Sequence, residues 1–141
     1  MSYSVLPAGE AFWRPSNQMG VLNTDLGRQL GAETLGARFW RLRPGQASTK
    51  HRHYVTVELY VVLEGTGRIR IDDDLLELPR MSSLLVQPDS VRQVFNDTEE
   101  EVLWIVFGTP NEVASTLEMS EETIAYMYPD GLKALPPELD A

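Results

Sequence analysis

The chain contains no cysteine among its 141 residues. This excludes disulfides, thiolate nucleophiles and zinc sites built from thiolates, so a bound metal must be held by nitrogen and oxygen. Also lacking is any run of about 18 apolar residues, the length that a membrane-spanning helix requires. Residues 1–18 have neither the basic start nor the continuous apolar stretch of a secretory signal. We therefore expect a soluble, cytoplasmic protein.

Basic residues are scarce relative to acidic ones. The chain has 12 Lys and Arg against 21 Asp and Glu, which gives a formal net charge of -9. The acidic residues are spread along the chain, as in the runs "IDDD" and "DTEEE". A phosphate backbone would be repelled by such a surface, so nucleic acid is not an expected partner.

Short apolar runs separated by turn residues fill the middle of the chain. The length fits one domain with a single core. Residues 57–65, "VELYVVLEG", are apolar enough for a buried strand, and "GRIRIDDD" places Ile69 and Ile71 on the face opposite Arg68 and Arg70. Further strand-like runs lie at residues 37–45, 82–90, 92–97 and 100–110. This spacing predicts an all-β sandwich or barrel.

The last part of the chain differs in character. Ser120 is a candidate N-cap, glutamates follow it in the first turn, and Pro129 and Gly131 would end a short helix. Residues 109–112, "TPNE", fit a capping box for another helix, but the following "VASTLEM" fits an extended arm equally well.

The only two histidines lie close together in the stretch "STKHRHYVTVELYVVLEGTG". On an extended backbone His51 and His53 face the same side, because successive side chains alternate. Glu58 follows a segment short enough to bend back toward them. Two histidines and one carboxylate form the ligand set of facial-triad metal sites. The same pair also fits an ordinary hydrogen-bonding role for partly buried imidazoles.

The wider spacing resembles the first signature motif of the cupin family. Gly45, five residues, His51, one, His53, four, Glu58, six and Gly65 match all five of its specified positions. The resemblance implies a double-stranded β-helix, or jelly roll, with a barrel core at about residues 37–108. An N-terminal arm at 1–36 and a helical or irregular tail at 109–141 would complete one cupin domain. It also implies one divalent metal on His51, His53 and Glu58, with a further histidine from a second motif.

The second motif is poorly preserved. In the run "MSSLLVQPDSVRQVFND" the family's histidine position falls on Arg92, and an alternative register would place Gln93 there. Guanidinium has no lone pair to offer a metal, so the family's fourth ligand is missing. Either a metal binds the remaining three ligands and Arg92 anchors an anionic substrate, with Gln93 beside it, or Arg92 pairs with Glu58 and no metal binds.

Other residues follow from their position relative to this motif. Tyr60 is expected on the same face of the strand as Glu58. There it could act as an acid or hydrogen-bond donor to a substrate, or be a core tyrosine whose hydroxyl bonds to a local partner. We expect Gly45, Gly65 and Gly67 to serve turns through positive φ.

Three functions follow from these residues. The first is a metal-dependent oxygenase, isomerase, epimerase or lyase that uses Fe, Mn, Ni or Zn on a small, anionic metabolite. The second is a metal-free barrel that binds or senses a small ligand, and the third is an inert structural barrel. We also expect a homodimer, because the apolar residues of 12–31 would pack across a two-fold axis or fold onto their own barrel.

Overall fold

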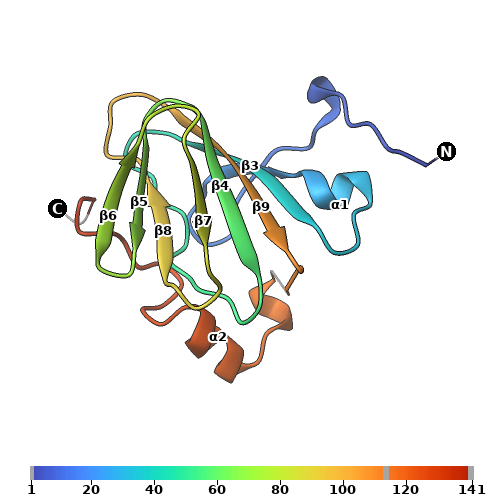
Figure 1. The fold of residues 1–141 in the computed structure, drawn as a ribbon. Helices are drawn as coiled ribbons and strands as arrows, with labels where there is room; N and C mark the ends of the chain where they lie inside the picture. The colour runs from blue at the N-terminus through green and yellow to red at the C-terminus, as the bar shows by residue number, and fades with distance from the viewer. Residues whose placement is uncertain (1, 113–114, 140–141) are drawn as a thin grey trace.

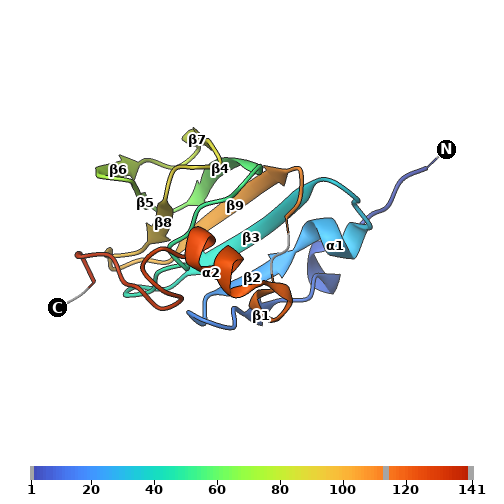
Figure 2. The same ribbon diagram turned by 90° about the horizontal axis from the view of Figure 1, so that it is seen from below.

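Two antiparallel sheets make up most of the computed structural model of the protein, which describes residues 2–112 and 115–139 (Figure 1). The larger sheet has the strand order β1-β2-β3-β9-β4-β7, and the smaller has the order β6-β5-β8. Seen from below, the two sheets face each other at an angle (Figure 2). The strands are β1 (Arg14–Pro15), β2 (Leu22–Asp25), β3 (Gly36–Leu42), β4 (Val57–Glu64), β5 (Gly67–Ile71), β6 (Asp74–Leu78), β7 (Ser83–Val86), β8 (Arg92–Phe95) and β9 (Val102–Thr109). The all-β prediction is confirmed.

The core lies between the two sheets and follows the alternation of the strands. Trp104 on β9, Val62 on β4, Leu42 on β3 and Ile69 on β5 are fully buried there. Arg68 lies on the other face of β5, as the alternating sequence predicts, and pairs there with Asp97. Side chains that face inward from β4 therefore enter the barrel interior, and Glu58 and Tyr60 of this strand are among them.

The N-terminal arm folds onto the barrel of its own chain. Strand β1 pairs with β2, and β2 pairs with β3 through Leu22 opposite Arg41. Between β2 and β3 the sequence forms a short helix, α1 (Leu26–Leu30), which pattern reading did not predict. The side chain of Asp25 caps it by accepting from the backbone N–H of Arg28. Within the single chain, residues 14–25 of the arm thus pair with their own barrel, and packing of the arm across a two-fold axis stays a prediction.

The C-terminal tail carries the predicted helix, α2 (Glu121–Met127), below the ends of β4 and β9 in Figure 1. Ser120 caps it by accepting from the backbone N–H of Thr123 at 3.1 Å. The tail also holds a short 3-10 helix, η2 (Thr116–Glu118), and η1 (Ala8–Glu10) lies in the arm. No helix among the described residues is long and apolar enough to cross a membrane.

The predicted helix after "TPNE" is not seen at residues 109–112. Thr109 ends β9, and Asn111 and Glu112 have no regular structure. Residues 113–114, which belong to the same prediction, lie outside the described residues. Glu112 caps no helix there, and its carboxylate instead contacts the segment after His53.

The motif glycines divide into two kinds. Gly45 and Gly65 have φ values of 86° and 76°, as predicted for turns. Gly67 is not among the residues with positive φ, so that prediction is wrong for it. A Cβ at Gly67 would lie 2.5 Å from Val62 Cγ2 and 2.6 Å from Trp104 Cζ2. Close packing against the core therefore requires glycine at this position.

We predict that Gly67→Ala destabilises the protein by roughly 1–3 kcal/mol, the range for overpacking a core. Urea unfolding followed by Trp fluorescence measures this change. Gly9→Ala is the matched control, because no described residue would lie within 4 Å of its Cβ. Equal unfolding midpoints for the two variants would show that the core yields to the extra methyl group.

Candidate metal centre

The histidine segment is held in an extended conformation between β3 and β4. His51 and Arg92 exchange backbone hydrogen bonds of 3.0 and 2.8 Å, and the N–H of His53 donates to Pro88 O at 2.7 Å. The N–H of Arg52 donates in another direction, to Met127 O of α2. As a result the two imidazoles face the same side, with ring centroids 4.9 Å apart. The sequence prediction of their convergence is confirmed.

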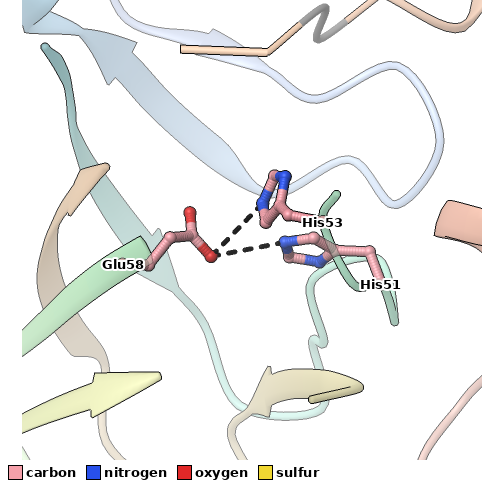
Figure 3. Close-up of side chains that lie close together, drawn as sticks. All are labelled: His51, His53 and Glu58. Atoms are coloured by element: carbon pink, nitrogen blue, oxygen red, sulfur yellow. Dashed lines mark ion pairs between the residues drawn. The ribbon is translucent and has the colours of Figure 1, made fainter. Parts of the chain in front are cut away.

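Glu58 projects from β4 toward both rings (Figure 3). Its Oε1 lies 3.6 Å from His51 Nε2 and 3.4 Å from His53 Nε2. One ligand atom from each of the three residues lies within 4.8 Å of the others. In the part of the chain that the structure describes, these residues form the one group of this kind.

The surroundings of the two imidazoles suit metal binding. Nδ1 of His51 lies 2.9 Å from Thr49 O, which fixes the proton on Nδ1 and leaves the lone pair of Nε2 free. Both ring nitrogens of His53 are buried without a hydrogen-bond partner in the described structure. A buried nitrogen without a partner loses free energy relative to water, and a metal ion would satisfy it. The three residues therefore fit a divalent cation.

Tyr60, two residues along β4, contacts the same carboxylate. Its hydroxyl donates to Glu58 Oε1 at 2.7 Å. Burial, followed by the charge of Glu58, raises the pKa of Tyr60 well above its ordinary value, so the hydroxyl stays protonated. The shared face predicted for Tyr60 and Glu58 is confirmed. The role of Tyr60 toward a substrate stays a prediction.

Arg92 lies at the inner side of the site on β8 and is fully buried. Its Nε is 3.7 Å from Glu58 Oε1, while Nη2 donates to Gln87 O at 2.6 Å and Nη1 to Pro88 O at 3.5 Å. Gln93 Nε2 donates to Ser48 O and Ala134 O. The substrate-binding roles of Arg92 and Gln93 stay predictions, and both side chains are held by backbone carbonyls.

Glu112 belongs to the site, although sequence reading placed it elsewhere. Its Oε2 lies 3.5 Å from His53 Nδ1. Its oxygens also accept from the backbone N–H groups of Tyr54, Val55 and Thr56 at 3.2, 2.5 and 2.7 Å. Burial would raise the pKa of Glu112, but these three hydrogen bonds outweigh it and lower the pKa. No local motif joins residues 53 and 112, so spacing alone could not have revealed this contact.

A cavity of about 890 Å³ opens in front of the three ligands. Its wall includes Tyr60, Glu112 and, from the tail, Met127 and Tyr128. Neither Arg92 nor Gln93 is among the described residues that line it. The volume is enough for a small metabolite beside a metal ion.

The chain belongs to the cupin family. The cupin domain matches residues 38–108, which include the whole candidate metal centre except Glu112. No curated protein sequence matches the chain.

Solved cupin structures share the fold. A sugar phosphate isomerase of the cupin superfamily from Silicibacter pomeroyi is 24% identical with a TM-score of 0.69, over 76% of each chain. A cupin protein from Bacteroides fragilis is 22% identical with a TM-score of 0.63, over 96% of this chain and 99% of its own. A predicted oxalate decarboxylase from Thermotoga maritima is 14% identical with a TM-score of 0.67, over 76% and 99%. These similarities establish the double-stranded β-helix.

Glu58 makes the metal-free protein sensitive to acid. Burial would raise its pKa, but the close approach and charge of the His51 and His53 imidazoles outweigh it and hold the pKa well below its ordinary value. A carboxylate with a lowered pKa stabilises the fold above its unfolded-state pKa, and this contribution is lost as pH falls through the folded-state pKa. We predict that the stability difference between wild type and Glu58→Gln shrinks as pH falls below about 4.3, the ordinary Glu value.

Urea unfolding of chelator-treated protein between pH 7 and pH 3 measures this difference. Glu77→Gln is the control, because the Glu77 side chain is 67% exposed. A wild-type advantage over Glu58→Gln that stays constant with pH would contradict the lowered pKa.

Proposed function

We propose that this cupin is a divalent-metal-dependent enzyme that acts on a small, anionic metabolite. The observation that carries the proposal is the convergence of His51, His53 and Glu58 at the cavity, with the ring nitrogens of His53 buried and unpartnered in the described structure. Fe, Mn, Ni and Zn all accept this set of nitrogen and oxygen ligands. The protein supplies three ligands, which leaves coordination positions for water or substrate.

A bound metal would supply Lewis-acid polarisation of a substrate oxygen, or oxygen chemistry if it is Fe(II). The protein's own residues would prepare the site. Tyr60 orients the carboxylate of Glu58 through its hydroxyl, and Thr49 O directs Nε2 of His51 toward the centre. Arg92 contributes a fixed positive charge behind Glu58, which favours an anionic substrate in front of the metal.

The substrate class of the proposal also draws on structural relatives. The Silicibacter pomeroyi structure is named a sugar phosphate isomerase, as is a putative one from Acidithiobacillus ferrooxidans. The Thermotoga maritima structure is named a predicted oxalate decarboxylase. Sugar phosphates and oxalate are both small anions with oxygens that a metal can polarise. Isomerase or lyase chemistry on such an anion is therefore the preferred form of the proposal, ahead of oxygenase chemistry.

A metal-free ligand-binding barrel is the second candidate, and one contact favours it. Arg92 is buried with its Nε 3.7 Å from Glu58 Oε1. The positive charge of Arg92 balances the negative charge of Glu58, so this part of the interior is close to neutral without a metal. A metal cation that binds Glu58 would have to share the carboxylate with the guanidinium of Arg92. In this case the cavity would bind a small anion without converting it.

The first experiment is elemental analysis of untagged protein purified without chelator, beside the His51→Ala, His53→Ala double variant. We predict near-stoichiometric metal in the wild type and none in the variant, because loss of both imidazoles leaves only one ligand. Circular dichroism of both proteins checks that the variant is folded.

Absence of metal from the wild type, even after incubation with Fe(II), Mn, Ni and Zn, would refute the enzyme proposal. The metal-free candidate then predicts a higher Tm in the presence of phosphate or small carboxylates, since a ligand that binds the folded state stabilises it.

A homodimer completes the proposal. The N-terminal arm presents Phe12, which is 65% exposed, together with Tyr3 and Val5. Exposed apolar side chains of this size favour an interface. We predict a dimer by sedimentation equilibrium and a weaker one for Phe12→Ser. Leu117→Ser is the control, because Leu117 is even more exposed, at 93%, but lies on η2. A monomer at all concentrations would exclude this assembly.

A further inference from the structure

We propose that Glu112 is a positioning residue that orients His53 for metal binding. The inference rests on the proposed metal function, and it concerns a residue outside the matched cupin domain. Glu112 holds the imidazole with its Nδ1–H toward the carboxylate, so that the lone pair of Nε2 faces Glu58 and the metal position.

The geometry at His53 indicates this orientation. Glu112 Oε2 lies 3.5 Å from Nδ1, on the opposite side of the ring from Glu58 Oε1, which is 3.4 Å from Nε2. Both ring nitrogens are buried and without a hydrogen-bond partner in the described structure. At 3.5 and 3.4 Å both contacts are electrostatic, and each carboxylate favours the tautomer that turns the N–H toward it. Glu112 therefore opposes the pull of Glu58 toward Nε2–H, and a metal at Nε2 decides in favour of Nδ1–H. When a metal occupies the lone pair of Nε2, the neutral imidazole can carry its proton only on Nδ1, where the N–H faces Glu112.

The two histidines reach the same orientation by different means. Nδ1 of His51 faces the carbonyl oxygen of Thr49, a backbone group two residues away. Nδ1 of His53 faces a side chain 59 positions along the chain. Because a carboxylate partner makes a metal-bound imidazole a stronger ligand, the two arrangements are not equivalent. A single substitution can therefore remove the orienting group from His53 while that of His51 stays intact.

Glu112 is itself held rigidly enough to orient another group. Its oxygens accept three backbone hydrogen bonds from Tyr54, Val55 and Thr56, the residues that connect His53 to β4. Glu112 also lies four residues beyond Gly108 of β9, which pairs with Glu58 of β4. The carboxylate thus connects the segment that carries His53 to the strand pair that carries Glu58.

The competing role is purely structural, in which Glu112 only fastens the turn at residues 54–56. Glu112→Gln separates the two roles. The amide oxygen in the place of Oε1 can still accept from the backbone N–H groups of Val55 and Thr56, so two of the three hydrogen bonds that hold the turn are retained. The charge is removed, and the amide N–H₂ in the place of Oε2 faces Nδ1 of His53. A donor at that position favours the tautomer with the proton on Nε2, which blocks the metal ligand.

The first measurement is a long-range ¹H–¹⁵N NMR spectrum of the metal-free protein, at about two pH units above the ordinary His value. The chain has only two histidines, so assignment needs one His51→Gln reference. We expect a larger share of the Nδ1–H tautomer of His53 in the wild type than in Glu112→Gln, because Glu58 favours Nε2–H in both proteins and only the wild type has the opposing carboxylate. His51 should keep Nδ1–H in both proteins.

The second measurement is zinc affinity by chelator competition. Loss of a residue that orients a metal ligand costs about 10- to 100-fold in affinity, and we expect this loss in Glu112→Gln. Glu99→Gln is the matched control, because it removes the same charge from an exposed loop before β9, at the other end of that strand from Gly108. Its zinc affinity should equal that of the wild type.

Two results would overturn the inference: the same tautomer populations of His53 in wild type and Glu112→Gln, or equal zinc affinities for the two proteins. A wild type that binds no metal, with a tautomer that still depends on Glu112, has a different meaning. It would refute the proposed metal function and support the orientation of His53 by Glu112.

Discussion

The carboxylate of Glu58 is the point on which the candidate site depends. Its Oε1 accepts from Tyr60 and is approached by Nε2 of His51, Nε2 of His53 and Nε of Arg92, all within 3.7 Å. A buried carboxylate is costly unless positive or hydrogen-bonding groups surround it. The strands that carry these groups are therefore fixed relative to β4 by charge as well as by packing, and the cavity opens beside this cluster.

Arg92 places a buried positive charge beside the three candidate ligands. A guanidinium fastened to the carbonyls of Gln87 and Pro88 cannot move away when a cation enters. Coulomb repulsion between the two is reduced only to the extent that Glu58 lies between them or an anion binds in front. The residue that stands in place of the family's fourth ligand would thus make the binding of a metal and the binding of an anion favour each other.

Local patterns predicted the parts of the structure that depend on the chain's own geometry. Alternation along an extended backbone placed His51 with His53, and Glu58 with Tyr60, because a strand leaves no other choice. The cap at Ser120 was predictable for the same reason, since it requires only residues within one turn. Helix α1 was not predicted because Gly27 interrupts its apolar pattern. Glycine is required there, since a Cβ at residue 27 would lie only 2.8 Å from the carbonyl oxygen of Leu35.

Contacts across the barrel follow a different rule. The approach of Glu112 to His53 depends on the length of β9, on the path of the chain after Thr109 and on the turn at residues 54–56, and none of these is encoded in a short spacing. The residues "TPNE" satisfy a helix-capping pattern, yet the carboxylate finds three backbone donors in that turn instead. Tertiary donors prevailed because the three backbone N–H groups of the turn have no other partner among the described residues and lie next to His53 in the chain, whereas an isolated helix of this length has little stability of its own. Ligands of a cupin site can therefore be predicted from sequence more readily than the residues that orient them.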